Sequence, residues 1–592
     1  FSFWSLIMDP NRDLPTLKEA GLTLRNHQIE GIQQILKWHE EGHGGIIADE
    51  MGLGKTCQTI CALLLLKKKF KKPKFVVICP LSVLNHWENE CSRFGLKELK
   101  LITYKGDKDC RRHLRARVNK GHWDVLLTTY QIFRNDHNFF AFHVDIYVVD
   151  EAHSVKSQRS QLYQTIRQKN TKFHLLLTGT PVQNDLDEFY SLLSLVDAEK
   201  YPIDEKDGFF LQSKENLVKE IKKATEMYVL RRLKSVVCEE LPTAQEVILY
   251  HGLTKFQRDL YNSILASNRS FFDSVATRSQ SLMSILVQLR KAVSHPYLFE
   301  GVEPTPFSNG PHLFTASAKF MVLDQLLSFL KRNNHRCLIF SQFKRTLDIL
   351  ADAMTVKGYL FEHFDGDVRA LERFNSINEF QKENSEIFCF LMTTKAGGVG
   401  LNLTAADTVI FIDSDLNPQN DIQAAARCHR IGQEKPVKVI RLLAEHTIDE
   451  RIQKRWFKKL KLSEFVLDDK SSYSDIGGLK EFLISDLTKL NESNNTSEDI
   501  YNLLTDEYFT SFLGKTDENG CWINEKEKNE EKEILEEVEL FPRSERIISG
   551  NKNSTKKIND KEEYHKIVEM FQDGAMGKDN RIQTALKRKS QV

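Results

Sequence analysis

A glycine-containing segment near the N-terminus has the residue types that bind phosphate. The stretch GIIADEMGLGKT covers residues 45–56 and has the pattern of a strand, a loop and the start of a helix. The loop glycines let backbone N–H groups point at a phosphate at the helix N-terminus, where Lys55 can neutralise charge and the Thr56 hydroxyl can bind Mg²⁺. Asp49 occupies the first glycine position of the strict pattern G-x-x-x-x-G-K-[ST]. We predict a nucleotide site here; the alternative is a glycine-rich turn before an ordinary helix.

Two adjacent carboxylates follow another apolar strand about a hundred residues later, in VVDEAH. Asp150 can hold a magnesium ion and Glu151 can polarise an attacking water molecule. Acid pairs at strand ends are common, so this signal is weak alone. It follows the phosphate-binding segment within the same predicted sheet, which is the order that a nucleoside triphosphatase needs. Together the two segments predict hydrolysis of a nucleoside triphosphate.

A third group of residues lies in the second half of the chain. AGGVGLNLTAAD has the pattern of a glycine-rich strand exit, and QAAARCHRIGQ places Arg427 and Arg430 three apart on one face of a predicted helix. Two arginines at that spacing can converge on one phosphate chain and stabilise transition-state charge when two lobes close. The alternative is an amphipathic helix whose arginines are solvated.

The elements that must position these residues alternate between strands and helices. Short β-branched runs alternate with helical patterns from about residue 44 to 181, and the same rhythm returns over residues 336–444. This pattern predicts an α/β protein with two parallel-sheet lobes separated by a cleft. Residues 186–300 have helical apolar spacing instead. Apolar density falls after about residue 467, and residues 525–539 hold eight Glu against three Lys.

Composition excludes several classes of protein. The 592 residues include 83 Lys+Arg and 82 Asp+Glu, so any affinity for nucleic acid must come from local patches. The longest apolar run, residues 60–66, is far shorter than the ~18 residues of a membrane span. The ten cysteines contain no C-x-x-C pair, which favours buried reduced thiols in a reducing compartment. Cys57 and Cys61 have a spacing that could bind metal, but core packing explains them better.

The blocks in this order resemble the helicase-superfamily-two motor in its Swi/Snf-type chromatin-remodelling form. The resemblance covers roughly residues 21–465. It includes LRNHQ (Q motif), DEMGLGKT (motif I), CPLSVLNHW (Ia), DEAH (II), LTGTPVQN (III), LIFSQ (IV) and the two arginine- and glycine-containing blocks (V and VI). Residues 290–307 and 405–433 most resemble the chromodomain-helicase-DNA-binding-like subfamily. The resemblance implies two RecA-like lobes with helical insertions and a largely irregular or helical C-terminal linker.

The resemblance also implies roles for individual residues, with ATP and Mg²⁺ as cofactors. Catalytic roles fall to Lys55, Asp150, Glu151 and the arginine fingers Arg427 and Arg430, and Mg²⁺ is held by Thr56 and Asp150. The implied nucleotide contacts are Arg25, Gln28 at adenine, Asp49, Glu50, Met51, Gly52, Leu53, Gly54, Lys55, Thr56 and Gly400. The implied contacts to the DNA backbone are Pro80, Thr129, Ser341, Lys395, which replaces a usual arginine, and Gly397. Contacts to phosphates and not to bases suit movement along arbitrary DNA.

The function that the resemblance implies is a nuclear, DNA-stimulated ATPase that translocates on duplex DNA and slides nucleosomes, with a link to the DNA-damage and poly-ADP-ribose response. Two alternatives stay open: a strand-separating DNA helicase, and a chromatin-binding scaffold with a vestigial motor. Intact Lys55, Asp150, Glu151 and Arg430 speak against the scaffold.

The expected boundaries are an N-terminal segment (1–20), a first lobe (21–235), a helical connector (236–317), a second lobe with its brace (318–467) and a charged regulatory linker (468–592). The subfamily typically carries a macro domain that binds ADP-ribose chains, and no third α/β rhythm follows the second lobe, so we expect a motor plus linker. A basic cluster near the C-terminus consists of Arg581, Lys587, Arg588 and Lys589. It could anchor on an acidic protein surface such as the histone patch of the nucleosome. The alternative is a solvated basic end or a localisation signal.

Overall fold

The computed structural model describes two compact units, which meet in the chain between Leu241 and Pro242 and are called here the first and second lobes. The described residues are 14, 17, 21–454 and 504–523, with gaps at 96–97, 156–157, 159, 170, 172, 180–185, 211–213, 238–240, 268–278, 365–369, 383, 395–401 and 518–519. Within this part of the chain, no helix is long and apolar enough to cross a membrane. The nine cysteines described are free thiols.

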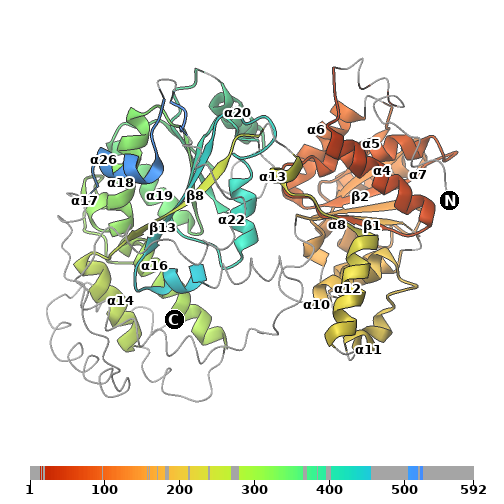
Figure 1. Ribbon diagram of the computed structural model, residues 1–592, viewed down its shortest axis with the longest axis horizontal. Coiled ribbons are helices and arrows are strands. Elements are labelled where there is room, and N and C mark those ends of the chain that lie inside the picture. Colours follow the sequence, from red (N-terminus) through yellow and green to blue (C-terminus); the bar gives the residue numbers. More distant parts are fainter. Residues whose placement is uncertain are drawn as a thin grey trace. The chain divides into compact units, whose positions relative to one another are not determined.

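The first lobe is built on a seven-stranded, wholly parallel sheet in the order β3-β4-β2-β5-β6-β1-β7. Its strands are β1 (Gly45–Ile47), β2 (Phe75–Cys79), β3 (Leu101–Tyr104), β4 (Val125–Thr129), β5 (Ile146–Asp150), β6 (His174–Leu177) and β7 (Val229–Leu230). Its helices are α4 (Asn26–Glu41), α5 (Lys55–Lys67), α6 (Leu84–Phe94), α7 (Lys108–Asn119), α8 (Tyr130–Asn135), α9 (Gln161–Arg167), α10 (Leu186–Val196), α11 (Lys206–Phe210), α12 (Lys214–Tyr228) and α13 (Lys234–Val237). In Figure 1, β1 and β2 of this sheet lie between α4 and α5 on one side and α10 and α12 on the other.

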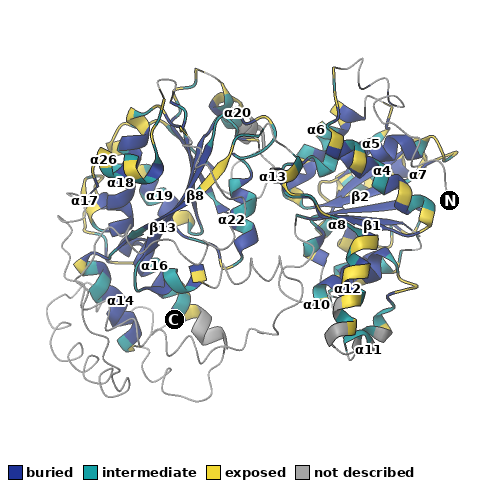
Figure 2. Ribbon diagram, in the orientation of Figure 1, coloured by how far each residue is buried: buried dark blue, intermediate teal, exposed yellow. Residues whose placement is uncertain are grey.

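Both faces of this sheet are covered, which is why its strands are continuous apolar runs. Along β2, Phe75 and Val77 face one hydrophobic cluster and Val76 and Ile78 face the other. Helices α4, α5 and α6 supply the first cluster, and α8, α9, α10 and α12 supply the second. The central strands are accordingly buried throughout (Figure 2). The strands expected from the β-branched runs over residues 44–181 are confirmed as β1, β2, β4, β5 and β6, and the short edge strands β3 and β7 are additions.

The second lobe has a six-stranded parallel sheet in the order β10-β11-β9-β12-β13-β8. Its strands are β8 (Ala244–His251), β9 (Cys337–Ser341), β10 (Phe361–Phe364), β11 (Cys389–Thr393), β12 (Thr408–Phe411) and β13 (Val437–Ala444). Its helices are α14 (Lys255–Ser267), α16 (Ser279–Ser294), α17 (His312–Thr315), α18 (Ala318–Arg332), α19 (Lys344–Val356), α20 (Ala370–Gln381), α22 (Pro418–Ala425) and α26 (Asp506–Leu513). The expected fold class, two parallel-sheet α/β lobes, is confirmed.

Strand β8 corrects the expectation that residues 186–300 are helical. It pairs in parallel with β13 along its whole length, from Ala244 opposite Val437 to His251 opposite Ala444. The strand lies at the sheet edge, where its first residues are exposed and only its second half is buried. The first half of β8 therefore lacks the apolar run of a central strand. The second lobe accordingly includes residues that we had assigned to a helical connector.

Residues 504–523 also belong to the second lobe. The side chains of Leu513 and Trp522 are buried in its hydrophobic cluster, and Thr516 and Trp522 form an isolated antiparallel bridge. The ring of Trp522 stacks on His335, with ring centroids 3.8 Å apart and planes inclined by 10°. Arg332 at the end of α18 forms an ion pair with Asp506. A part of the expected linker thus contributes to the core of a lobe.

Candidate nucleotide site

The predicted phosphate-binding loop lies where β1 ends and α5 begins. Gly52 and Gly54 have φ values of +91° and +85°, a region that side chains other than glycine rarely occupy. A Cβ atom on Gly54 would lie 2.6 Å from Nε2 of Gln28, so the close approach of α4 also requires glycine there. The loop therefore keeps an open backbone in front of the N-terminus of α5, the arrangement that favours bound anions.

The Lys55 ammonium lies over this loop and donates to the carbonyl oxygen of Asp49 at 2.7 Å. Burial lowers the pKa of Lys55, and the carboxylates of Glu151 and Asp150 act in the opposite direction. Ile47 of β1 and Asp150 of β5 are both aligned with Leu177 of β6, so the loop after β1 and the carboxylate pair lie at the same edge of the sheet. The sequence-predicted groups are thus brought together within the first lobe.

The carboxylate pair lies at the C-terminal end of β5: Asp150 is the last residue of the strand and Glu151 follows it, at the same edge of the sheet as the end of β1. The indole N–H of Trp87 donates to Oδ2 of Asp150 at 2.7 Å, and the backbone N–H of Glu151 donates to Oδ1 at 2.9 Å. Burial, followed by the neighbouring Glu151, raises the pKa of Asp150 to about 6. Glu151 has a φ of +54°, a conformation that costs a residue with a Cβ atom and that is concentrated at functional sites.

Tyr130 secures the backbone of this pair. Its hydroxyl donates to the carbonyl oxygen of Asp150 and, at 3.2 Å, to that of Glu151. Burial raises the pKa of Tyr130 well above its usual value, so the group stays protonated and able to donate. Neither Trp87 nor Tyr130 is among the residues expected at the site from sequence. Trp87 ends the CPLSVLNHW block, whose implied role was to grip DNA, and no sequence signal pointed to Tyr130.

The Q-motif residues attach α4 to the loop. Gln28 accepts from the backbone N–H of Arg25 at 3.0 Å, and its amide donates to the Leu53 carbonyl oxygen at 3.4 Å. Nε2 of His27 lies 3.1 Å from the same oxygen. Both ends of the Gln28 amide therefore have protein partners. The adenine contact assigned to Gln28 stays a prediction.

Several loop side chains point into the protein. Asp49 is fully buried and forms an ion pair with Arg232, with 2.5 Å between Oδ2 and Nη2. Glu50 accepts from the backbone N–H of Lys234 at 2.8 Å. Met51 and Leu53 are buried. These residues are therefore available to a phosphate chain through their backbone groups, while their side chains hold the loop in place.

The donor set of this site fits a magnesium–nucleotide complex. A hydroxyl at Thr56 and carboxylates at Asp150 and Glu151 are the hard oxygen donors that Mg²⁺ prefers. Lys55 and the N-terminus of α5 offer positive charge to phosphate. The arrangement can bind a nucleoside triphosphate and activate water beside it.

In the second lobe, the prediction that Arg427 and Arg430 lie on one face of a helix is wrong. Helix α22 ends at Ala425, so Arg427 and Arg430 lie in the turns that follow it. The same turn region contains Gly432, which has a φ of +100°. It also contains Cys428, whose thiol donates to the Ala406 carbonyl oxygen at 3.0 Å. The turn is bonded to the segment that precedes β12, through Leu403 and Ala406, instead of continuing the helix. Both arginines are half-buried.

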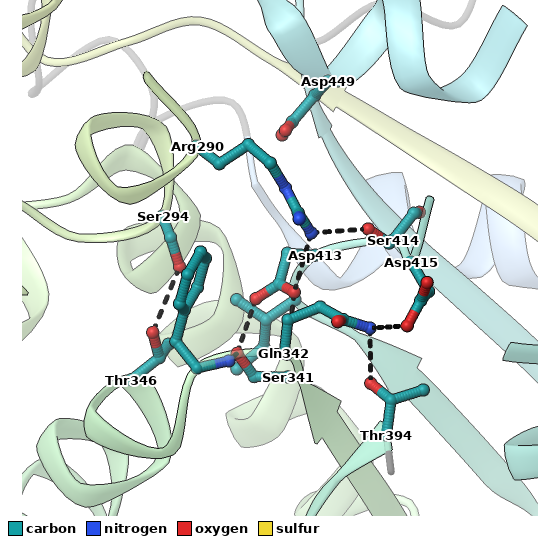
Figure 3. A network of polar contacts seen from close by, with 12 residues as sticks. Arg290, Ser294, Ser341, Gln342, Thr346, Thr394, Asp413, Ser414, Asp415 and Asp449 are labelled. Atoms are coloured by element: carbon teal, nitrogen blue, oxygen red, sulfur yellow. Dashed lines mark hydrogen bonds and ion pairs between the residues drawn. The ribbon is translucent and has the colours of Figure 1, made fainter. Parts of the chain in front are cut away.

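Ser341 lies in a buried polar network at the end of β9 (Figure 3). Its hydroxyl donates to Asp413 at 2.5 Å, and Asp413 also accepts from the backbone N–H of Gln342 at 2.8 Å. The guanidinium of Arg290 lies 3.7 Å from Asp413 and donates to the Ser414 carbonyl oxygen at 2.8 Å. The Ser341 side chain is therefore committed to Asp413, and the contact to DNA assigned to it stays a prediction.

The remaining predicted contacts are placed only in part. Thr129 is buried and caps α8 by accepting from the backbone N–H of Ile132 at 3.4 Å, and Pro80 precedes the short 3₁₀ turn Leu81–Val83. Outside the described residues lie Gly400, Lys395, Gly397, Arg581, Lys587, Arg588 and Lys589.

Comparisons with known proteins agree with this architecture. An SNF2-related domain matches residues 27–298, and a helicase conserved C-terminal domain matches residues 318–432. The chain is 44% identical over 528 residues to chromodomain-helicase-DNA-binding protein 1-like of Mus musculus, covering 86% of this chain and 57% of that protein. It is 41% identical over 540 residues to the Danio rerio protein of the same name, covering 88% and 52%.

A third relative is SWI/SNF-related matrix-associated actin-dependent regulator of chromatin subfamily A member 1 of Homo sapiens. It is 41% identical over 457 residues, which cover 76% of this chain and 44% of that protein. The chain thus spans about half the length of the curated relatives that it matches. The matched domains and these identities show that the chain belongs to the SNF2-related family of helicase-like proteins.

Proposed function

We propose that this protein is an ATP-dependent chromatin remodeller that hydrolyses ATP in its first lobe and uses the energy to move along duplex DNA and slide nucleosomes. The observation that carries the proposal is the joint placement of a phosphate-binding loop and a carboxylate pair in one lobe, with Trp87 and Tyr130 holding the pair. Relatives named for chromatin remodelling and for helicase and DNA-binding functions support the wider role.

In the first lobe, positively charged groups bind the phosphate chain, and oxygen donors hold the metal and accept the proton. The N-terminus of α5 and Lys55 bind the phosphate chain, and the Thr56 hydroxyl and Asp150 hold the metal. When bound, Mg²⁺ neutralises phosphate charge and orients the terminal phosphate. Glu151 accepts a proton from the attacking water, and its position depends on the Tyr130 bonds to the backbone on both sides of the peptide.

We assign the arginine-finger role to Arg427 and Arg430, which follow α22 in the second lobe. An arginine supplied from a second lobe stabilises transition-state charge only in the closed state, so hydrolysis is coupled to movement. Replacing either arginine with glutamine should lower kcat for ATP while ATP still binds the first lobe.

The test measures ATP turnover without polymer, with free duplex DNA and with nucleosomes, while a native gel follows nucleosome position. Glu151→Gln should abolish turnover and movement but retain ATP binding. Glu98→Gln, which changes an exposed carboxylate of the same lobe, is the matched control and should behave as wild type. Turnover at background in all three conditions would refute the motor and favour a chromatin-binding scaffold. A duplex with a fluorophore and a quencher on opposite strands tests the helicase alternative, because unwinding in that assay would contradict translocation without strand separation.

We further propose a nuclear location and a contact between the basic cluster Arg581, Lys587, Arg588 and Lys589 and the acidic histone patch. Neutralising these four residues should remove nucleosome stimulation and leave DNA stimulation unchanged; equal loss or equal retention in both assays would contradict the contact. A link to poly-ADP-ribose or to a macro domain supplied in trans is proposed from the family alone. Stimulation or inhibition of turnover by either added partner tests it.

A further inference from the structure

A buried ion pair joins the phosphate-binding loop to the end of the first lobe. Arg232 contacts Asp49 through two nitrogens: Nε donates to Oδ1 at 3.0 Å, and Nη2 donates to Oδ2 at 2.5 Å. The Asp49 side chain is fully buried, and the Arg232 side chain is 10% exposed. Two parallel bonds of this kind fix geometry as well as charge, which a lysine cannot reproduce.

Arg232 holds more than the carboxylate. Its Nη2 also donates to Oε1 of Gln58 on α5 at 3.0 Å, and its Nη1 donates to the His27 carbonyl oxygen on α4. Its own carbonyl oxygen accepts from the backbone N–H of Glu50 at 3.0 Å. One guanidinium therefore connects the two helices that flank the loop to the start of the loop itself.

Asp49 connects Arg232 to Lys55. Its carboxylate is held by Arg232, while its carbonyl oxygen accepts the bond from Lys55 at 2.7 Å. Gln58 donates both to Asp49 Oδ2 at 3.2 Å and to the Leu53 carbonyl oxygen at 3.4 Å. The first and last parts of the loop are thus attached to the same polar cluster, and Lys55 rests on one of its members.

We propose that Arg232 is a positioning residue for the nucleotide, which sets the conformation of the phosphate-binding loop through Asp49 and Gln58. The inference deepens the proposed function and rests on it, because the loop is taken to bind ATP. It also gives Asp49 a role other than the nucleotide contact expected from the sequence. Without the guanidinium, a buried carboxylate would lack its charged partner, and the loop would have to rearrange to hydrate it.

An ion pair that only stabilised the fold would affect the melting temperature but not ATP binding. Its loss would lower the melting temperature, but at temperatures well below melting the folded protein would bind ATP as before. A positioning role predicts weaker ATP binding in the folded protein, because the loop amides and Lys55 bind ground state and transition state alike. The KM for ATP should then rise with little change in kcat.

The experiment compares Arg232→Gln, Arg232→Lys and Asp49→Asn with wild type, using steady-state ATPase kinetics, a fluorescent ATP analogue for binding, and thermal melting. The neighbouring Arg231→Gln is the matched control, since Arg231 is exposed and the variant removes the same charge from the same segment. We expect KM and the dissociation constant to rise about tenfold or more in Arg232→Gln, with kcat within about threefold, and to rise less in Arg232→Lys. The double variant Asp49→Asn/Arg232→Gln should be no worse than Arg232→Gln alone, because loss of the guanidinium already removes its interaction with Asp49.

Two results would overturn the inference: nucleotide affinity within twofold of the Arg231→Gln control, whatever the melting temperature, or effects of the two single variants that multiply in the double variant. A wild-type protein that binds the ATP analogue but does not turn ATP over would count against the proposed function. The binding measurements would still decide the role of Arg232.

Discussion

Replacing Trp522 with alanine tests whether residues 504–523 are a structural part of the second lobe. Trp522 is 2% exposed, its ring stacks on His335, and its indole N–H donates to the Thr408 hydroxyl at 3.3 Å. The ammonium of Lys438 lies 5.6 Å from the ring centroid. The side chain thus contacts the start of β12, the start of β13 and the residues that follow α18.

The expected loss can be worked out from these contacts. Burying an aromatic side chain removes about 150–250 Å² from water, which at about 25 cal/mol per Å² gives ~4–6 kcal/mol as an upper bound. Measured truncations of buried Trp and Phe cost ~3–5 kcal/mol. We therefore expect the free energy of unfolding of the second lobe to fall by ~3–4 kcal/mol. At 2–4 °C per kcal/mol for a unit of this size, its melting temperature should fall by about 6–16 °C.

Hydrogen exchange read by mass spectrometry is the assay of choice, because it reports each lobe separately. Peptides from β9 and β12 should lose protection in Trp522→Ala, whereas peptides from β2 and β5 in the first lobe should not. Ile523→Ala is the matched control, because the adjacent Ile523 is 43% exposed and surface truncations usually change stability by less than ~0.5 kcal/mol. If Trp522→Ala changed exchange no more than Ile523→Ala, the segment would not be part of the folded lobe and the reasoning would be refuted.

Two further predictions concern single contacts. Trp87→Phe removes the hydrogen-bond donor to Asp150, and a hydrogen bond to a charged group contributes ~1.5–3 kcal/mol. The Mg²⁺ concentration for half-maximal ATPase activity should therefore rise about tenfold or more. An unchanged magnesium requirement would contradict the role given to the indole. His295 is buried, and its Nδ1 accepts from the Tyr297 N–H while Nε2 lies 2.9 Å from the Leu313 carbonyl oxygen. Burial lowers its pKa to about 4, below the ~6.5 of an exposed histidine, so its stabilising contribution is complete above pH ~6.5 and declines as the pH falls. Between pH 7 and pH 5 the free energy of unfolding should decrease by ~2 kcal/mol more in wild type than in His295→Gln, as measured by urea titration at both values; equal decreases would contradict this assignment.

Much of the fold follows from sequence because central parallel strands are buried on both faces. Runs such as Phe75–Cys79 and Cys337–Ser341 are apolar throughout and stand out from the helices around them. Strand β8 does not, because an edge strand is half-exposed and its polar residues resemble those of a helix. The turn that follows Ala425 is bonded to Leu403 and Ala406, about twenty residues earlier in the chain, and no local pattern encodes these contacts.

The site divides in the same way. Lys55, Asp150 and Glu151 could be predicted because their chemistry is written in contiguous motifs. Trp87, Tyr130 and Arg232 could not, because each reaches the site from 20 to 183 residues away in the chain and acts on a group that the fold alone brings near. Their side chains have many ordinary uses in a core or on a surface. Only the contacts distinguish a residue that holds a carboxylate of the proposed site from one that fills space.

The pairing of β8 with β13 has a consequence for how the chain folds as it is synthesised. Ala244 must wait for Val437, its partner 193 residues later, which at 5–20 residues per second is a delay of about 10–40 s. The first lobe completes its sheet with β7 at Leu230 and needs no such wait. During this wait β8 has no partner strand, and its unpaired backbone groups are an edge that other chains could join. The second lobe is therefore the part of a nascent chain that most needs protection from aggregation.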